Sequence, residues 1–260
     1  MSRKFFQLAA PSYVIPGTVG ENCLVLKDKV REVGLTLFET EACLNYTSQD
    51  IPSEVAALNL KFHVHLPLNY DWTLGAEEVF NLTTKLLQKV HFLGPDKFVL
   101  HPPENERDLD AFASLWGGRL EKRGKGEAGT GSKWELRWQD LLVENIAENS
   151  LTGCWDVVCA KNLGVCLDLG HILAYDQWSL LDLPTLWERV RLLHVYGLEI
   201  DKKHYGLEKL NEEGKELLRC ILEQVRAGTT LLLEVFSLAE FVHSKQMLTD
   251  WLHSWGIELV

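Results

Sequence analysis

Seven segments with the length and composition of buried strands end in a histidine or an acidic residue. Strands that are buried on both faces are rich in apolar residues throughout, so polar ends indicate a function. The seven terminal residues are Glu39, His65, His101, Glu144, Asp168, His194 and Glu234. Three residues of the same kinds follow closely: His171, Asp201 and His204. Imidazole and carboxylate groups without thiolates suit Zn²⁺, Mn²⁺, Fe²⁺ or Co²⁺, so we expect a site for divalent metal ions.

The rest of the chain alternates short apolar runs with longer amphipathic stretches. Eight runs have strand length: Phe5–Ala9, Gly34–Glu39, Lys61–His65, Lys97–His101, Asp140–Glu144, Gly164–Asp168, Val190–His194 and Thr229–Glu234. Between and after them apolar residues recur at helical spacing, as in Leu238, Phe241, Val242, Leu248 and Leu252. Eight such units in 260 residues predict an α/β fold, a single (β/α)8 TIM barrel over residues 1–260. A doubly wound open sheet is the alternative, but no GxGxxG motif follows the first strand.

A closed barrel would bring the polar strand ends together around one axis, although they lie far apart in the sequence. Carboxylates gathered there would repel one another and be forced to protonate unless a cation neutralised them. This electrostatic argument supports a metal centre more strongly than any single residue does.

The number of bound ions separates two mechanisms. One ion held by Glu144, Asp168, His194 and Glu234 would leave the two glutamates as an acid/base pair, which is the chemistry of a sugar or hydroxy-acid isomerase or epimerase. The remaining candidate ligands would then be superfluous. Two or three ions would use them and would favour phosphoester hydrolysis, with Glu144 and Glu234 as catalytic residues that bridge the ions and position the nucleophile.

The motifs around these strand ends resemble those of a known family. The segments are PSYVIP (11–16), LKDKVREVGLTLFE (26–39), HVHLPL (63–68), VLHPP (99–103), LLVENI (141–146), VCLDLGHILAY (165–175), LLHVYG (192–197) and LLLEVFS (231–237). Together they resemble the cobamide-remodelling hydrolases (CbiR), within the xylose-isomerase-like barrels and the apurinic-site endonuclease superfamily. The similarity runs from near residue 11 to near residue 240.

The resemblance implies a metal-dependent hydrolase that cuts the phosphoribosyl bond in the nucleotide loop of a cobamide. The products would be cobinamide phosphate and the lower-ligand nucleoside. By position, the resemblance implies metal ligands at His65, His101, Glu144, Asp168, His171, His194 and Glu234. Superfamily members with three metals carry an Asp and a His after strand seven, which makes Asp201 and His204 the candidate ligands of a third ion.

Four residues are candidate substrate contacts: Tyr13, Glu39, His63 and Tyr196. His63 shares a strand face with His65 but lies one layer deeper, where it either orients a metal ligand or touches the substrate. Tyr196 stands where relatives often carry a histidine, so it is expected to face the substrate. Further aromatic residues of the expected rim are Tyr70, Trp72 and Tyr175. A catalytically silent corrinoid-binding protein is the alternative of a different class.

The amino-acid composition limits the expected partners and the expected cellular compartment. The formal net charge of −11 disfavours nucleic acid as a partner and leaves a small-molecule substrate, the cobamide, as the expected one. No apolar run reaches the roughly 18 residues of a membrane helix. The apolar stretch behind Arg3 and Lys4 ends at Pro11, so we do not expect it to be a secretory signal. The six cysteines form no CxxC pair, so we expect them to be reduced and the protein to be cytoplasmic.

One segment interrupts the alternating pattern. Residues 123–133 carry four glycines and no apolar side chain larger than alanine. A phosphate-binding loop follows a strand and opens a helix, whereas this segment follows a helix and precedes a strand. It is therefore expected to be a mobile loop on the N-terminal face of the barrel, opposite the chemistry.

Overall fold

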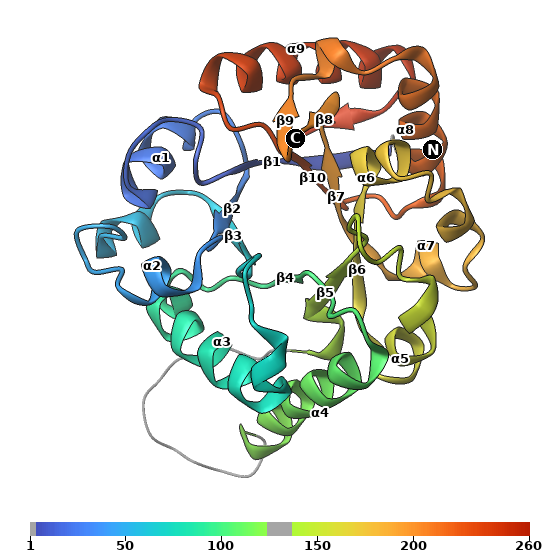
Figure 1. Cartoon of the computed structure of the whole chain (residues 1–260). Coiled ribbons are helices and arrows are strands. Elements are labelled where there is room, and N and C mark those ends of the chain that lie inside the picture. The colour runs from blue at the N-terminus through green and yellow to red at the C-terminus, as the bar shows by residue number, and fades with distance from the viewer. Residues whose placement is uncertain (1–3, 124–136) are drawn as a thin grey trace.

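The computed structural model describes residues 4–123 and 137–260, and Figure 1 shows it along the barrel axis. Eight parallel strands form the wall: β1 (Phe5–Pro11), β2 (Glu32–Thr36), β3 (Lys61–His65), β4 (Phe98–Leu100), β5 (Leu141–Glu144), β6 (Gly164–Asp168), β7 (Val190–Val195) and β10 (Thr230–Leu233). Each strand pairs with the next, and β1 pairs in parallel with β10, which closes the barrel. This closure confirms the predicted TIM barrel and excludes the doubly wound sheet.

Helices follow the strands and form the outer ring in Figure 1. They are α1 (Val19–Leu26), α2 (Thr40–Leu44), α3 (Ala76–Val90), α4 (Glu106–Arg123), α5 (Trp155–Ala160), α6 (Leu169–Ala174), α7 (Leu186–Arg189), α8 (Glu212–Gln224) and α9 (Leu238–Ser254). Their apolar faces pack on the outside of the wall in one continuous core. One residue departs from the predicted pattern: Val242 on α9 is half exposed.

Three short strands lie outside the wall. The strand β11 (Glu258–Leu259) runs beside β1 near the start of that strand. The strands β8 (Leu198–Ile200) and β9 (Lys203–Tyr205) form an antiparallel ribbon directly after β7. The ribbon is therefore attached to the end of the barrel at which the strands finish.

The strand boundaries differ from the sequence prediction in one place that matters. The second strand ends at Thr36, so Glu39 is not a strand end and instead precedes the first turn of α2. Of the glycine-rich segment 123–133, residues 124–133 lie outside the described residues. No helix in the described ranges is long and apolar enough to cross a membrane. All six cysteines are free, as expected, although Cys220 is exposed.

Candidate metal centre

The barrel interior consists of layers of inward-facing side chains. Its middle layer is apolar: Ala9, Val99, Leu142, Cys166, Leu192 and Leu232. Side chains alternate along a strand, so the residue two positions further faces inward again, one layer closer to the strand ends. Five of these next positions carry candidate ligands: His101, Glu144, Asp168, His194 and Glu234. The strand register thus places these five side chains in one layer above an apolar floor.

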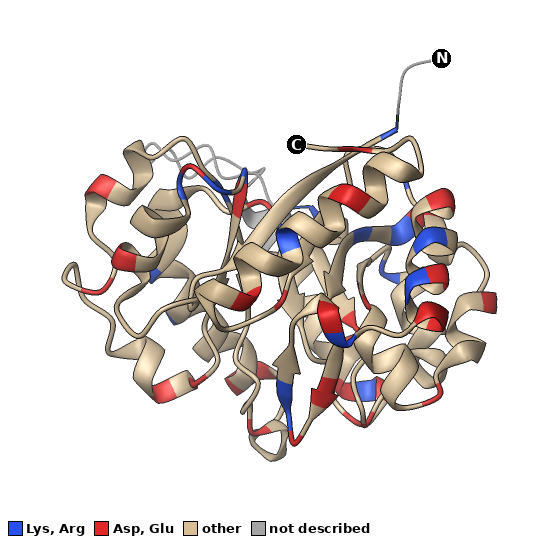
Figure 2. Ribbon diagram, turned by 90° about the horizontal axis from the view of Figure 1, so that it is seen from above, with Lys and Arg blue, Asp and Glu red and all other residues tan. Residues whose placement is uncertain are grey.

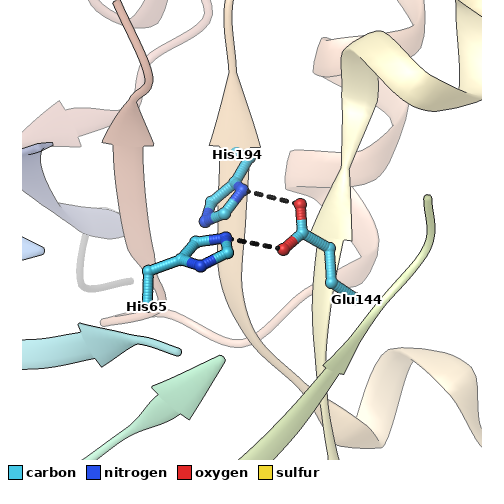
Figure 3. A group of neighbouring side chains, drawn as sticks. All are labelled: His65, Glu144 and His194. Carbon is cyan, nitrogen blue, oxygen red and sulfur yellow. Dashed lines mark hydrogen bonds and ion pairs between the residues drawn. The ribbon is translucent and has the colours of Figure 1, made fainter. Parts of the chain in front are cut away.

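Glu144 lies at the centre of the first group. Its carboxylate oxygens lie 3.1 Å from Nε2 of His65, 3.3 Å from Nε2 of His101 and 3.0 Å from Nδ1 of His194. Figure 3 shows His65 and His194 pointing toward the two oxygens of this carboxylate. Glu144 is 1% exposed, so its charge is neutralised by these side chains rather than by water.

Asp168 and Glu234 form a second group with His194. Nδ1 of His194 lies 3.2 Å from Oε2 of Glu234 and 3.7 Å from Oδ2 of Asp168. Oδ1 of Asp168 accepts a hydrogen bond of 2.7 Å from the backbone N–H of His171, and thereby caps α6. Oδ2 of Asp168 and Nε2 of His194 are both buried and have no hydrogen-bond partner among the described residues. Buried polar atoms of this kind are costly, and a ligand would satisfy them.

A third group lies at the ribbon and includes a residue that the sequence analysis did not single out. Nε2 of His171 lies 3.3 Å from Oε2 of Glu199, and Nε2 of His204 lies 4.0 Å from the same oxygen. Glu199 and His204 stand directly opposite each other on β8 and β9. The hydroxyl of Tyr175 donates a 2.8 Å hydrogen bond to Oε1 of Glu199 and orients it.

The structure does not bring Asp201 into this group. Asp201 and Lys202 form the two-residue turn between β8 and β9, with φ of 50° and 62°. A tight hairpin turn requires positive φ at both central residues, and aspartate tolerates that conformation better than most residues. Asp201 is exposed at the tip of the ribbon, and Glu199 occupies the place predicted for it.

The electrostatics of the site couple its carboxylates to its imidazoles. Burial would raise the pKa of Glu144, but His194 and His101 lower it well below its usual range. Burial likewise opposes protonation of His194, yet Glu234 and Glu144 raise its pKa well above its usual value. Burial would lower the pKa of His204, but Glu234 raises it to about 9. The lowered pKa values of Glu144 and Glu234 and the raised pKa values of His194 and His204 thus favour ion pairs between these carboxylates and imidazoles.

This donor set fits divalent metal ions. Among the described residues, four overlapping groups of three have ligand atoms within 4.8 Å of one another, and His101 is in none of them. These groups comprise eight side chains: His65, Glu144, Asp168, His171, His194, Glu199, His204 and Glu234. Nitrogen and oxygen donors without thiolate are suited to Zn²⁺, Mn²⁺, Fe²⁺ or Co²⁺. A bound cation would replace the protons that now neutralise the carboxylates, because imidazole binds metals in its neutral form.

Two of the predicted substrate contacts share a pocket beside these groups. Tyr13 and Glu39 line a hollow of about 450 Å³ together with Phe38 and Tyr46. The ring of Phe38 lies edge-on to His65, with 5.7 Å between the ring centroids, so Phe38 separates the hollow from the donor groups. We refer to this hollow as the side pocket.

The other two predicted contacts are buried elsewhere. Nδ1 of His63 lies 2.5 Å from Glu32 in the deeper barrel interior, and the side chain is not among the grouped donors. Tyr196 is 0% exposed, and its ring stacks on His204 with centroids 3.8 Å apart. Tyr196 thus supports a donor rather than lining an open surface. Of the expected aromatic rim, Tyr70 is also buried and bonds to Thr83.

Comparisons with known proteins identify the fold. No protein-family profile matches the chain, and no curated protein matches it in sequence. Solved structures do match over nearly the full length. A D-tagatose 3-epimerase-like protein superposes with a TM-score of 0.70 at 15% identity, over 95% of this chain and 97% of that chain. The IolI protein with a bound zinc atom has a TM-score of 0.67 at 10% identity, over 96% and 99%.

A third match is the probable 3-DHS dehydratase AsbF of Bacillus anthracis, with a TM-score of 0.62 at 10% identity over 94% of this chain and 98% of that chain. These likenesses show the fold, a (β/α)8 TIM barrel, in agreement with the closed parallel sheet. Within that fold, this chain carries an inward layer of imidazole and carboxylate donors at the end where the strands finish.

Proposed function

We propose that the protein is a hydrolase that uses two or three divalent metal ions to cleave a phosphoester. The observation that carries this proposal is the number of grouped donors among the described residues, which is eight. One ion held by Glu144, Asp168, His194 and Glu234 would leave the other four without a role. A second and a third ion would use them.

Each group has residues that would hold an ion. Glu144 faces His65 on one side and His194 on the other, which suits a carboxylate that bridges two ions. Glu234 lies between His194 and His204, and so links the second group to the third. Clustered divalent ions supply a nucleophile near neutral pH and stabilise the oxygens of an in-line displacement at phosphorus. The fixed carboxylates keep the charges of such a centre balanced.

The proposed substrate is a cobamide, and the sequence motifs around the donors support this choice. In the reaction, the oxygen of water forms a bond to phosphorus while the bond from phosphorus to the ribose oxygen breaks. The ribose oxygen takes a proton from water, so the products are cobinamide phosphate and the nucleoside. The side pocket, with its aromatic residues Tyr13 and Phe38, offers a surface for an apolar ring of a large substrate.

A one-metal isomerase or epimerase is the second candidate. It is favoured by the set Glu144, Asp168, His194 and Glu234, and by the similarity of the fold to a D-tagatose 3-epimerase-like protein. In that case the two glutamates would move a proton beside a carbonyl group. The four additional donors weigh against it: His65, His171, Glu199 and His204.

The test is an isotope experiment. Metal-loaded protein is incubated with adenosylcobalamin in ¹⁸O-labelled water, and the products are identified by mass. We expect α-ribazole without label and cobinamide phosphate with one ¹⁸O atom. Glu234→Gln should lose nearly all activity and remain folded, whereas the exposed control Glu213→Gln should keep it.

Three outcomes would contradict the proposal. An active, metal-loaded Glu234→Gln protein would exclude the proposed role of the centre. Untouched cobamide together with turnover in a panel of sugars would favour the isomerase. Cobamide that binds without turnover would indicate a silent corrinoid-binding protein.

A further inference from the structure

A second pocket opens at the opposite end of the barrel, where the strands begin. It has a volume of about 280 Å³. Lys97 and Thr230 line it, and they stand two residues before Val99 and Leu232 of the apolar middle layer. The pocket is therefore the lower mouth of the barrel interior, separated from the donor groups by that apolar layer.

Basic side chains dominate this pocket: Lys61, Lys97, Arg137, Arg191 and Arg226. Two of them have acidic partners. Nζ of Lys97 lies 3.0 Å from Glu32 and 2.9 Å from Asp96, and the guanidinium of Arg137 lies 3.0 Å from Asp140. Within the part of the chain that the structure describes, five basic groups thus face three carboxylates, which leaves an excess of two positive charges.

The excess positive charge is located on the other three basic side chains, Lys61, Arg191 and Arg226. Lys61 donates a hydrogen bond to the neutral side chain of Gln7, at 3.3 Å. For the guanidinium groups of Arg191 and Arg226, no described residue provides a hydrogen bond or an ion pair. Burial and the nearby charges of Arg226 and Arg137 lower the pKa of Arg191. Like charges are therefore held close together here, in a chain whose net charge is −11. In the side view of Figure 2, the end of the barrel that carries the C-terminus shows several blue residues, whereas the opposite end shows mostly red ones.

The lining defines the kind of ligand. Two excess positive charges match a dianion, and guanidinium groups present paired N–H donors to phosphate oxygens. Among the described residues no aromatic side chain lines the pocket, and its volume is below the usual range for drug-sized ligands. A nucleobase or a corrin ring therefore does not suit it, whereas a phosphate group does.

We propose that this basic pocket, formed around Lys61, Arg191 and Arg226, binds a phosphate dianion, either free or as the terminal group of a small phosphomonoester. This site is separate from the proposed metal centre and does not depend on the reaction catalysed there.

The experiment is a calorimetric titration of the metal-loaded protein with inorganic phosphate and, in a second arm, with glycerol phosphate. Sodium chloride keeps the ionic strength constant. Charge-assisted hydrogen bonds of this kind are worth enough to make Arg191→Gln and Arg226→Gln bind at least tenfold more weakly. Arg226 is exposed, so its variant should fold even if Arg191→Gln does not. The exposed Arg107→Gln is the matched control and should bind as the wild type does.

Phosphate could also bind at the metal centre, and the variants separate the two sites. Binding at the metal centre would be weakened in Glu234→Gln and retained in Arg226→Gln. The proposal predicts the reverse for the basic pocket. Equal binding by the wild type and Arg226→Gln would overturn it, as would the lack of binding of both inorganic phosphate and glycerol phosphate at millimolar concentration. Binding of glycerol phosphate but not of free phosphate would identify the monoester as the ligand.

Discussion

Replacing Glu199 by glutamine tests which carboxylate completes the third donor group. Oε2 of Glu199 lies 3.3 Å from His171, and the amide of glutamine would keep the shape of the side chain while removing its charge. Loss of a residue that only orients a ligand typically lowers metal affinity by roughly 10- to 100-fold. Loss of a direct carboxylate ligand should cost at least roughly 100-fold, which corresponds to about 2.8 kcal/mol.

The assay is the metal content per chain after dialysis, followed by a titration with Zn²⁺ or Mn²⁺. Glu199→Gln should retain one ion fewer than the wild type and should hydrolyse its substrate more slowly. Asp201→Asn is the matched control, because Asp201 lies in an exposed turn with a φ of 50°. It should bind the same number of ions as the wild type.

The reverse pattern would refute this reasoning. If Asp201→Asn lost an ion while Glu199→Gln kept the full number, the ribbon would have to rearrange on metal binding. Equal metal content in all three proteins would mean that the third group holds no ion.

Three other perturbations have defined outcomes. Burial would raise the pKa of Glu32, but His63 and Lys97 lower it to about 2. The ionised form of Glu32 therefore adds about 3 kcal/mol to the free energy of unfolding above pH ~4.5, and this contribution is lost as the pH falls toward 2. In urea unfolding at pH 7, Glu32→Gln should be destabilised and Asp96→Asn nearly unchanged; equal stability of Glu32→Gln and the wild type would contradict this. Gly170→Ala places a Cβ 2.1 Å from the Tyr196 ring and should lower activity. The control Gly153→Ala places its Cβ in open space and should keep full activity. Full activity of Gly170→Ala would show that the position of Tyr196 is unimportant. Removal of metal by a chelator should abolish activity and lower the Tm, and divalent metal should restore both; activity in the chelated protein would exclude a metal-dependent mechanism.

The main donors could be expected from the sequence because two simple rules apply to them. A buried parallel strand should be apolar, so Glu144 after Leu-Leu-Val and Asp168 after Val-Cys-Leu are conspicuous. A closed barrel then brings such ends together. The same rules account for His65, which ends β3.

Glu199 could not be found by these rules, since it does not end a strand of the barrel. It lies on a strand of three residues whose partner strand is equally short. The available signal was a turn: Asp201 and Lys202 between two alternating segments indicate a hairpin that pairs Glu199 with His204. Asp201 was the more obvious ligand by composition, but its backbone forms the turn.

The environment of His63 and Tyr196 depends on contacts between distant segments. His63 binds Glu32 of a neighbouring strand, and Tyr196 packs on Gly170 and His204. Alternation along a strand shows that a side chain points inward, but it does not show whether that side chain meets substrate or another protein group.

The number of divalent ions bound per chain tests the proposed function most directly. It can be measured by elemental analysis of protein purified without chelators and loaded with a slight excess of metal. The proposed multi-metal centre predicts two or three ions per chain. A single tightly bound ion, with no further ion taken up on titration, would contradict it and would favour the isomerase or epimerase.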